Sequence, residues 1–262
     1  MQIWQYALLG VIQGLTEFLP ISSKSHLLLT ERLLGVNPPG VVFEVALHVG
    51  TLLSVLLVYR SELWGIIKGR NWRYIGLVAL CAAVSATPIL LFHEPLEALM
   101  ESSRVVLYIG VGLLVTAAWL VLADIRLRRP RERRPIDALA AVVIGVAQAI
   151  AILPGISRSG STIGAALQTG EEREHAARFS FLLSIPMILG AALIKAKDMG
   201  ETVASGGISP AGMAVGFICS LLAGVAAIYL VLWMLRRARL VYFAAYCVLV
   251  SAGCFVLYAT RP

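Results

Sequence analysis

The sequence predicts an all-α polytopic membrane protein with six transmembrane helices and two re-entrant helical hairpins in an inverted-topology repeat. Of its 262 residues, 59% are hydrophobic and 14% are charged, and the mean hydropathy is +0.84, whereas soluble domains carry roughly 25% charged residues. Apolar runs of about 18 to 25 residues recur, which is the length that crosses a bilayer. These runs are continuous, unlike the alternating strands of a β-barrel. The composition therefore excludes a soluble enzyme, a disordered chain and a disulfide scaffold.

Six of the apolar runs have the length of a full span, and two further apolar stretches are interrupted near their middle. The interruptions are Pro20 in residues 3–29 and Pro154-Gly155 in residues 136–170. Proline breaks a helix, and non-helical backbone survives at membrane depth only where protein or water covers it. We therefore predict a re-entrant hairpin in each broken stretch. The predicted spans are 41–58, 74–92, 105–123, 176–196, 211–235 and 240–259.

Basic residues are concentrated in three loops between the runs, at 60–73, 124–134 and 236–239. Loops rich in Lys and Arg face the cytoplasm, and this role accounts for the net charge of +7 without a nucleic-acid partner. Counting spans from these loops, residues 136–170 begin and end on the cytoplasmic side, whereas the first hairpin enters from the opposite side. Both termini are then expected outside.

Short echoes indicate that the chain, a single membrane domain over 1–262, contains an internal repeat. Residues 10–13 (GVIQ) are echoed by residues 145–148 (GVAQ). Each half is one hairpin followed by three spans, and because three is odd, the second copy is inverted. Inverted repeats with broken helices place their site at the repeat interface, near the membrane midplane. The halves cover about 1–123 and about 136–262.

The first hairpin tip carries polar and ionisable side chains at a depth where burial is expensive, which makes them functional candidates. Glu17 precedes the break, and Gln13, four residues earlier, shares its helical face. A polar turn wetted at the membrane interface is the alternative interpretation. The candidates after the break are Ser22, Ser23, Lys24 and His26.

The second tip, LPGISRSGST, combines glycines, serines and one arginine. Backbone N–H groups at the start of a helix suit an anion, and the planar fork of Arg158 matches phosphate oxygens. Alternatively, Arg158 pairs with Glu17 as a structural ion pair, which a phosphate could still displace. The other candidates at this tip are Ser157, Ser159, Gly160 and Thr162.

Together the two tips combine a carboxylate, hydroxyls, an imidazole and an anion cradle. This set suits phosphoryl transfer on a lipid-embedded substrate, with either a water or a serine as the attacking group. Glu44 and His48, four residues apart in the run 41–58, either point into the site or pair with each other.

Two segments, GVIQGLTEFLPISSKSHL and LPGISRSGST, resemble the signature motifs of the undecaprenyl-diphosphate phosphatases, the bacitracin-resistance family. FEVALHVGTL and RFSFLLSIPMILGA are also similar to that family, so the resemblance covers nearly the whole chain. It implies removal of the terminal phosphate of undecaprenyl diphosphate at the outer face of the bacterial inner membrane, which recycles the lipid carrier for peptidoglycan and confers bacitracin resistance. It also implies the same six-span, two-hairpin fold and a divalent cation, Mg²⁺ or Ca²⁺.

The resemblance assigns roles at matching positions of the first motif. Glu17 matches a metal ligand or general base, Ser23 the nucleophile, and His26 an acid or base that would shuttle the proton, or a phosphate contact. Gln13 stands where the family has Glu or Gln, so it is expected to bind a metal through its carbonyl oxygen but not to act as a base. Lys24 adds a phosphate contact or sits beside the pocket.

In the second motif, Ser157 and Arg158 match positions where the arginine holds the diphosphate. Ser22, Ser159 and Gly160 are expected to contact the same group. The expected partners are the lipid substrate and membrane lipids, and a homodimer is left open.

Two rival functions follow from other features. Inverted repeats with broken helices are a transporter architecture, so a flippase of the prenyl phosphate carrier lipid is the alternative to a phosphatase. Phosphate release in detergent separates the two, because a pure flippase releases none. A non-catalytic scaffold would gain nothing from polar residues at the tips.

Overall fold

The computed structural model describes residues 1–36, 40–128, 133–204, 209–237 and 239–260, without the side chains of 40–41, 89–90, 93, 97 and 195–204. The regular elements of these residues are all α-helices, which confirms the all-α prediction. In chain order they are α1 (Ile3–Phe18), α2 (Ser23–Leu34), α3 (Gly40–Val58), α4 (Arg60–Lys68), α5 (Trp72–Leu91), α6 (His93–Glu101), α7 (Val105–Arg128), α8 (Ala138–Ile150), α9 (Arg158–Thr169), α10 (Arg173–Ala204), α11 (Pro210–Arg236) and α12 (Val241–Thr260).

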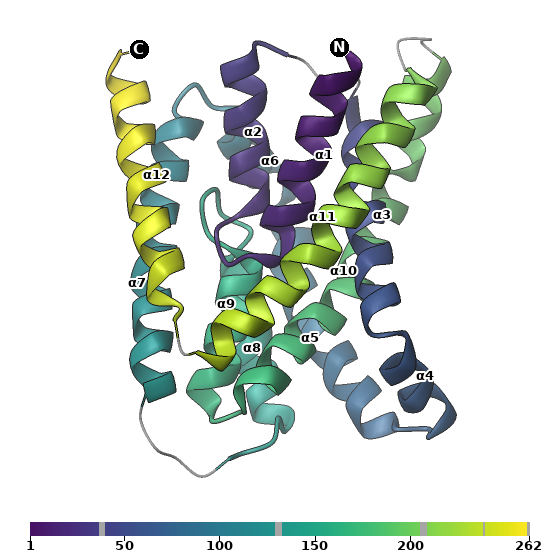
Figure 1. The fold of residues 1–262 in the computed structure, drawn as a ribbon, viewed down its shortest axis with the longest axis vertical. Coiled ribbons are helices and arrows are strands. Elements are labelled where there is room, and N and C mark those ends of the chain that lie inside the picture. The colour runs from purple at the N-terminus through teal and green to yellow at the C-terminus, as the bar shows by residue number, and fades with distance from the viewer. Residues whose placement is uncertain (37–39, 129–132, 205–208, 238, 261–262) are drawn as a thin grey trace.

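Both predicted helix breaks are present, and each separates the two arms of a helical hairpin. The first lies between α1 and α2 and contains Pro20, and the second lies between α8 and α9 and contains Pro154 and Gly155. At the tips, Ser22 has φ +71° and Gly155 has φ +86°, a backbone region that favours glycine. Figure 1 shows the two hairpins extending from opposite ends of the molecule, with their tips meeting near mid-height.

The second arm of the first hairpin is longer than the sequence predicts. The prediction ends at residue 29, whereas α2 continues to Leu34. The added turn is stopped by Gly35, which adopts the left-handed conformation and donates its N–H to Glu31 and Arg32 carbonyls. This glycine cap is a common helix terminator.

Several helices are long and apolar enough to cross a membrane, so the chain is a multi-pass membrane protein. Among the described residues these are α7, α10 over Arg173–Ile194, α11 and α12. A fifth span is formed if α3 and α4 are counted together, although the two are bent by 70°. The remaining predicted run, 74–92, corresponds to α5.

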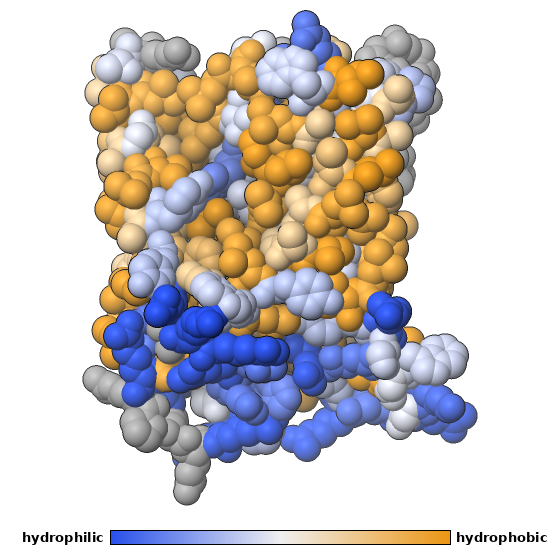
Figure 2. All heavy atoms as spheres, in the orientation of Figure 1, coloured by the Kyte–Doolittle hydropathy of each residue, from blue (hydrophilic) through white to orange (hydrophobic). Residues whose placement is uncertain are grey.

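Hydrophilic side chains gather at one end of the molecule, next to an apolar band, and both termini lie at the other end (Figures 1 and 2). The described parts of the three loops predicted to be basic lie at the hydrophilic end, where α4, the ends of α7 and α11 and the starts of α8 and α12 are found. Residues 129–132 of the second loop lie outside the described residues.

Glycines allow each hairpin to pack closely on a long helix. A Cβ added at Gly10 would lie 2.3 Å from the Gly216 carbonyl oxygen of α11, and one at Gly14 would lie 2.4 Å from that of Ser220. In the other half, a Cβ at Gly145 would lie 2.9 Å from the Cys81 carbonyl oxygen of α5. Small residues let membrane helices approach in this way, so α1 rests on α11 as α8 rests on α5.

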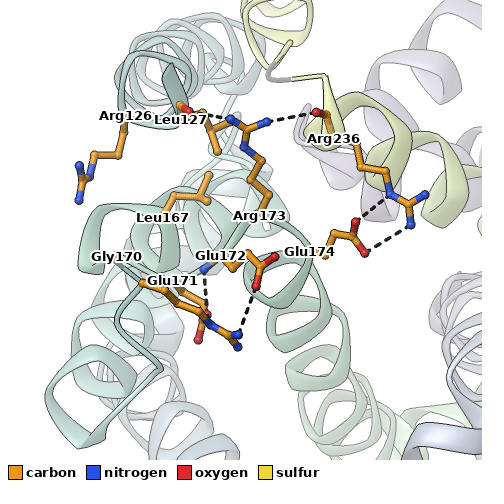
Figure 3. Close-up of a pocket in the computed structure, with 10 residues that line it drawn as sticks. Arg126, Leu127, Leu167, Gly170, Glu171, Glu172, Arg173, Glu174 and Arg236 are labelled. Carbon is orange, nitrogen blue, oxygen red and sulfur yellow. Dashed lines mark hydrogen bonds and ion pairs between the residues drawn. The ribbon is translucent and has the colours of Figure 1, made fainter. Parts of the chain in front are cut away.

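Arg173, at the start of α10, ties helix ends together at the hydrophilic end. Its guanidinium donates to the Leu127 carbonyl of α7 at 2.8 Å and to the Arg236 carbonyl of α11 at 3.1 Å, where a cation complements the helix dipole. Arg236 in turn pairs with Glu174 at 2.9 Å. Figure 3 shows these groups around a cavity of about 510 Å³.

Candidate functional site

Glu17 is the point at which the two hairpin tips meet. Its side chain is buried at the end of α1. Arg158 Nη2, from the start of α9, donates to Glu17 Oε1 at 2.5 Å. The Ser23 hydroxyl, from the start of α2, donates to Glu17 Oε2 at 2.7 Å. The structure therefore brings together Glu17, Ser23 and Arg158, three of the four residues predicted to be catalytic. The fourth is His26.

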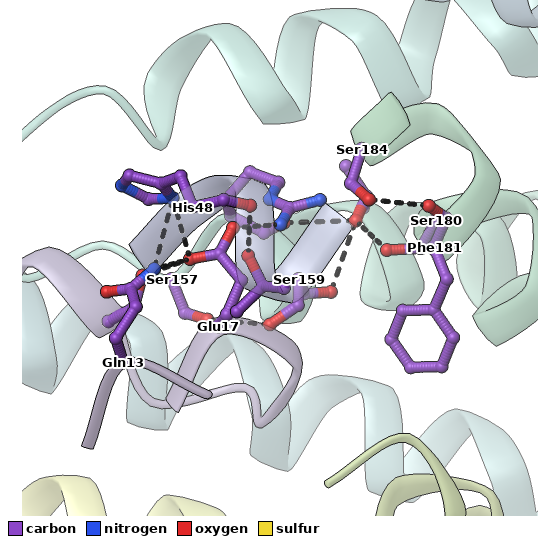
Figure 4. A network of polar contacts seen from close by, with 12 residues as sticks. Gln13, Glu17, His48, Ser157, Ser159, Ser180, Phe181 and Ser184 are labelled. Carbon is purple, nitrogen blue, oxygen red and sulfur yellow. Dashed lines mark hydrogen bonds and ion pairs between the residues drawn. The ribbon is translucent and has the colours of Figure 1, made fainter. Parts of the chain in front are cut away.

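Gln13 and His48 complete the surroundings of the carboxylate (Figure 4). The Gln13 amide nitrogen lies 2.9 Å from Glu17 Oε2 and 3.0 Å from His48 Nδ1. Because the amide nitrogen is a donor, Nδ1 accepts, and this network assigns the imidazole proton to Nε2. His48 Nε2 lies 3.9 Å from Glu44. His48 therefore faces the site and also pairs with Glu44, so the two arrangements that the sequence left open are both present.

A cavity of about 170 Å³ opens beside these groups. Its polar lining comes from Glu17, Glu44, His48 and Arg158, and its apolar lining comes from Val45 of α3 and from α10. A cavity with one polar wall and one apolar wall suits an amphiphile whose charged group is attached to a hydrocarbon. The lining residues of α10, which the sequence did not single out, are Met187, Ile188, Ala191 and Ala192.

Arg158 also has a guanidinium nitrogen in the site that makes no hydrogen bond to the described residues. Its Nη1 is buried and has no hydrogen-bond partner among the described residues, while Nη2 is held by Glu17. An unpaired buried donor is costly, and a charged donor is best satisfied by an anionic oxygen. The predicted Glu17–Arg158 ion pair is therefore present, and it leaves one arm of the guanidinium available to an anion.

The second tip is held by hydroxyls from two other elements. The Gly155 N–H donates to the Ser25 hydroxyl at 3.0 Å, and its carbonyl accepts from the Thr116 hydroxyl of α7 at 3.0 Å. The same Thr116 oxygen accepts from the Ser157 N–H at 3.0 Å. Sequence reasoning missed Thr116 and Ser25 as positioning residues, because a hydroxyl in a helix commonly bonds its own backbone.

The remaining predicted serines also make contacts within the protein. The Ser157 hydroxyl caps α9 by accepting from the Gly160 N–H at 3.1 Å, and the Ser159 hydroxyl donates to the Leu19 carbonyl at 2.9 Å. The Ser22 and Ser25 hydroxyls lie 2.9 Å apart. These bonds shape the tips, and the diphosphate contacts expected of Ser22, Ser157, Ser159 and Gly160 stay predictions.

Thr162 lies one turn further along α9, where its hydroxyl is 2.6 Å from that of Ser180 in α10. Lys24 is exposed at the start of α2. Neither residue lines the cavity beside Glu17.

His26 is turned toward α12 and away from Glu17. Its Nδ1–H donates to the Ser22 carbonyl at 2.8 Å, and its Nε2 accepts from the Tyr246 hydroxyl at 2.9 Å. The two rings are stacked, with centroids 5.5 Å apart. Within the described part of the chain, no hydrogen bond joins His26 to Ser23 or Glu17, so the imidazole beside the carboxylate is that of His48. A proton shuttle through His26 stays a prediction that these contacts do not support.

Gln13 and Glu17 could bind a divalent cation only if oxygens of the substrate complete the coordination shell of the ion. Among the described residues, no three His, Cys, Asp or Glu side chains converge as a metal site built from protein alone would require. The Gln13 carbonyl oxygen is buried and has no hydrogen-bond partner in the same residues. Mg²⁺ commonly takes one or two protein oxygens together with substrate phosphates, and the two side chains offer such oxygens.

Comparisons with known proteins agree with the motifs. The family model described as "Bacitracin resistance protein BacA" matches residues 6–253. An undecaprenyl-diphosphatase of Carboxydothermus hydrogenoformans is 38% identical over 261 residues, covering 99% of this chain and 98% of the relative. Another, from Halothermothrix orenii, is 39% identical and covers 98% of both chains. A third, from Alcanivorax borkumensis, is 40% identical over 256 residues, which covers 94% of this chain and 95% of the relative.

Proposed function

The chain belongs to the bacitracin resistance protein BacA family, and from this premise we propose that it hydrolyses undecaprenyl diphosphate to undecaprenyl phosphate and inorganic phosphate. The relatives above are named undecaprenyl-diphosphatases. The observation that carries the proposal is the buried Nη1 of Arg158, which has no partner among the described residues and lies beside the Glu17 carboxylate, in a cavity with an apolar wall. The reaction recycles the lipid carrier of peptidoglycan synthesis, and it underlies bacitracin resistance.

Arg158 holds the diphosphate in this proposal. Nη2 stays on Glu17 while Nη1 donates to a phosphate oxygen, so binding satisfies a donor for which the described residues provide no acceptor. The lipid chain leaves the site past the apolar wall of α3 and α10. His48 lies on the same cavity and faces Glu17 Oε2 at 3.8 Å.

Ser23 is placed to attack the terminal phosphorus, because its hydroxyl already donates to Glu17. Glu17 takes the proton as Ser23 Oγ forms its bond to phosphorus, and the bond to the bridging oxygen breaks, with undecaprenyl phosphate leaving with the electron pair. Water then hydrolyses the phosphoserine and restores the hydroxyl. In the alternative, water attacks directly and Ser23 only orients the phosphate.

Gln13 and Glu17 would hold a divalent cation, Mg²⁺ or Ca²⁺, whose charge would neutralise phosphate oxygens. We therefore expect a chelator to reduce phosphate release to the rate without enzyme, and added Mg²⁺ to restore it. The control is thermal unfolding, which should change little because no cluster of three ligating side chains is found in the part of the chain that the structure describes. Full activity in the presence of chelator would contradict the assignment.

The topology proposed for this site is six spans, α3, α5, α7, α10, α11 and α12, with α1–α2 and α8–α9 re-entrant. Its support is the matched packing of α1 on α11 and α8 on α5, as an inverted repeat requires. The hydrophilic, basic end then faces the cytoplasm of a bacterial inner membrane. Both termini, and the opening of the site, lie toward the outer face.

The decisive test is phosphate release from a C55 or shorter prenyl diphosphate by the purified protein in detergent. The hairpins that enter from opposite ends also fit a flippase of the carrier lipid. A flippase would release no phosphate in detergent and would act only in sealed vesicles. Phosphate release that depends on Glu17 and Arg158 supports the hydrolase, and its absence overturns it.

Thr116→Val should slow the reaction without removing a reacting group. The change keeps the side-chain shape but leaves the Gly155 carbonyl and the Ser157 N–H unpaired, at about 1–3 kcal/mol for each buried group. We expect kcat to fall about 10-fold or more as the tip beside Arg158 loosens. Thr116→Ser, which keeps the hydroxyl, should retain most of the kcat of the unsubstituted protein. If Thr116→Val had the same kcat as the unsubstituted protein, Thr116 would not be needed to position the second tip.

A further inference from the structure

A second, basic hollow lies at the hydrophilic end of the bundle, away from the diphosphate site. It has a volume of about 300 Å³ and lies where α7 ends and α11 turns into α12. Three arginines line it, Arg128, Arg237 and Arg239, together with Val241 and Tyr242. The phosphatase reaction proposed above uses none of these residues.

The charge of this hollow is only partly neutralised. Arg128 pairs with the buried Asp124 at 2.7 Å. The Arg237 guanidinium instead lies 4.1 Å from the centre of the Trp233 ring, and that of Arg239 lies 5.7 Å from the centre of the Tyr242 ring. Among the described residues neither of these two arginines forms an ion pair with a carboxylate. Aromatic faces orient a guanidinium without cancelling its charge, so the hollow keeps two positive charges.

The larger cavity at the same end shows the contrast (Figure 3). There, Arg236 pairs with Glu174, and Arg133 pairs with Glu171 and Glu172, each at 3.3 Å. Arg173 donates to helix carbonyls, and Arg126 is the fourth arginine of the lining. The lining of that cavity holds three carboxylates for its four arginines, whereas the described lining of the smaller hollow holds three arginines and no carboxylate. The smaller hollow is therefore the one that would attract an anion.

The surroundings of the hollow indicate where the anion comes from. Trp233 is 47% exposed and Tyr242 56% exposed, on helices that are both long enough to cross the membrane. Exposed Trp and Tyr near the end of a span sit at headgroup depth, and basic pockets between spans on the cytoplasmic side bind lipid headgroups. We propose that this hollow binds the phosphate of an anionic glycerophospholipid, held by Arg237 and Arg239.

The test measures binding of phosphatidylglycerol to the purified protein by native mass spectrometry, with phosphatidylcholine as the neutral lipid. The Arg237→Gln/Arg239→Gln variant is compared with Arg60→Gln/Lys68→Gln, which removes the same charge from exposed positions of α4 at the same end. We expect affinity for phosphatidylglycerol to fall about 10-fold in the first variant and less than about 2-fold in the second. Binding of phosphatidylcholine should not change in either.

Three results would overturn the proposal. Equal losses in both double variants would mean that diffuse surface charge, not the hollow, binds the lipid. If millimolar inorganic phosphate displaced phosphatidylglycerol as effectively as added phosphatidylglycerol does, the hollow would be a site for free phosphate. If the double variant unfolds, the single variants Arg237→Gln and Arg239→Gln take its place, and unchanged affinity for phosphatidylglycerol in both would show that the two guanidinium groups do not hold the lipid. Phosphate release from the prenyl diphosphate is measured in parallel, so that failure of the lipid-site proposal can be distinguished from failure of the proposed hydrolase activity.

Discussion

Replacement of Arg158 by alanine is expected to lower phosphate release from undecaprenyl diphosphate by about 10³-fold or more. The variant loses the donor that the diphosphate would satisfy, and it leaves Glu17 as a buried carboxylate without its ion-pair partner. Breaking a buried pair costs about 3–5 kcal/mol, and removing a positioned donor to a developing oxyanion costs about 10²–10³ in rate. The measurement is single-turnover phosphate release, beside a thermal unfolding curve.

A second variant separates catalysis from a purely structural ion pair. Glu17→Gln/Arg158→Met replaces both charges by neutral side chains of similar size, so it should recover most of the stability lost in Arg158→Ala. We expect it to remain inactive. If it released phosphate at close to the normal rate, the pair would be structural and the diphosphate would be held elsewhere. Arg158→Lys keeps the charge but not the fork, so a partial loss is expected.

Ser23→Ala is expected to have an effect of comparable size. The serine hydroxyl donates to Glu17 at 2.7 Å, so the variant removes the proposed nucleophile from the base that activates it. Loss of a nucleophile commonly lowers turnover by several powers of ten, about 10³-fold or more. The measurement is rapid-quench analysis of phosphate release, with acid trapping of the phosphoenzyme.

The matched control is Ser25→Ala, two positions away on the same tip. Ser25 accepts from the Gly155 N–H, so its loss should slow the reaction by loosening the tip while a phosphoserine at Ser23 can still be trapped. Turnover close to the normal rate in Ser23→Ala would establish water as the attacking group. The serine would then only orient the phosphate.

The helix breaks and the meeting of the tips could be predicted from the sequence because their causes are local. Pro20 and Pro154 each lack a backbone N–H donor and interrupt an apolar stretch, and the basic loops fix which end each hairpin enters from. The charged tip residues were then expected to converge, and Glu17 lies 2.5 Å from Arg158. The added turn of α2 ends at the Gly35 cap, which lies beyond the apolar stretch and the proline break that predict the hairpin.

The contacts between elements were not predictable. Thr116 bonds to the second tip, whereas Thr51 and Thr169 bond to carbonyls of their own helices, and nothing local in the sequence distinguishes the three. The imidazole beside Glu17 was also hard to choose. His26 lies in the motif, but the direction of α2 turns it toward Tyr246, while His48 reaches the site from α3.

The bond between Glu17 and Arg158 joins residues 141 positions apart, and this has a consequence for biosynthesis. The ribosome makes the first hairpin long before it makes α9, so the carboxylate must wait in the nascent protein without its guanidinium. Until α9 arrives, the carboxylate has Gln13, Ser23 and His48 of the first half beside it but lacks the guanidinium that balances its charge, and an uncompensated charge at membrane depth is costly. The ion pair that joins the two tips therefore forms only after the second hairpin has entered the membrane.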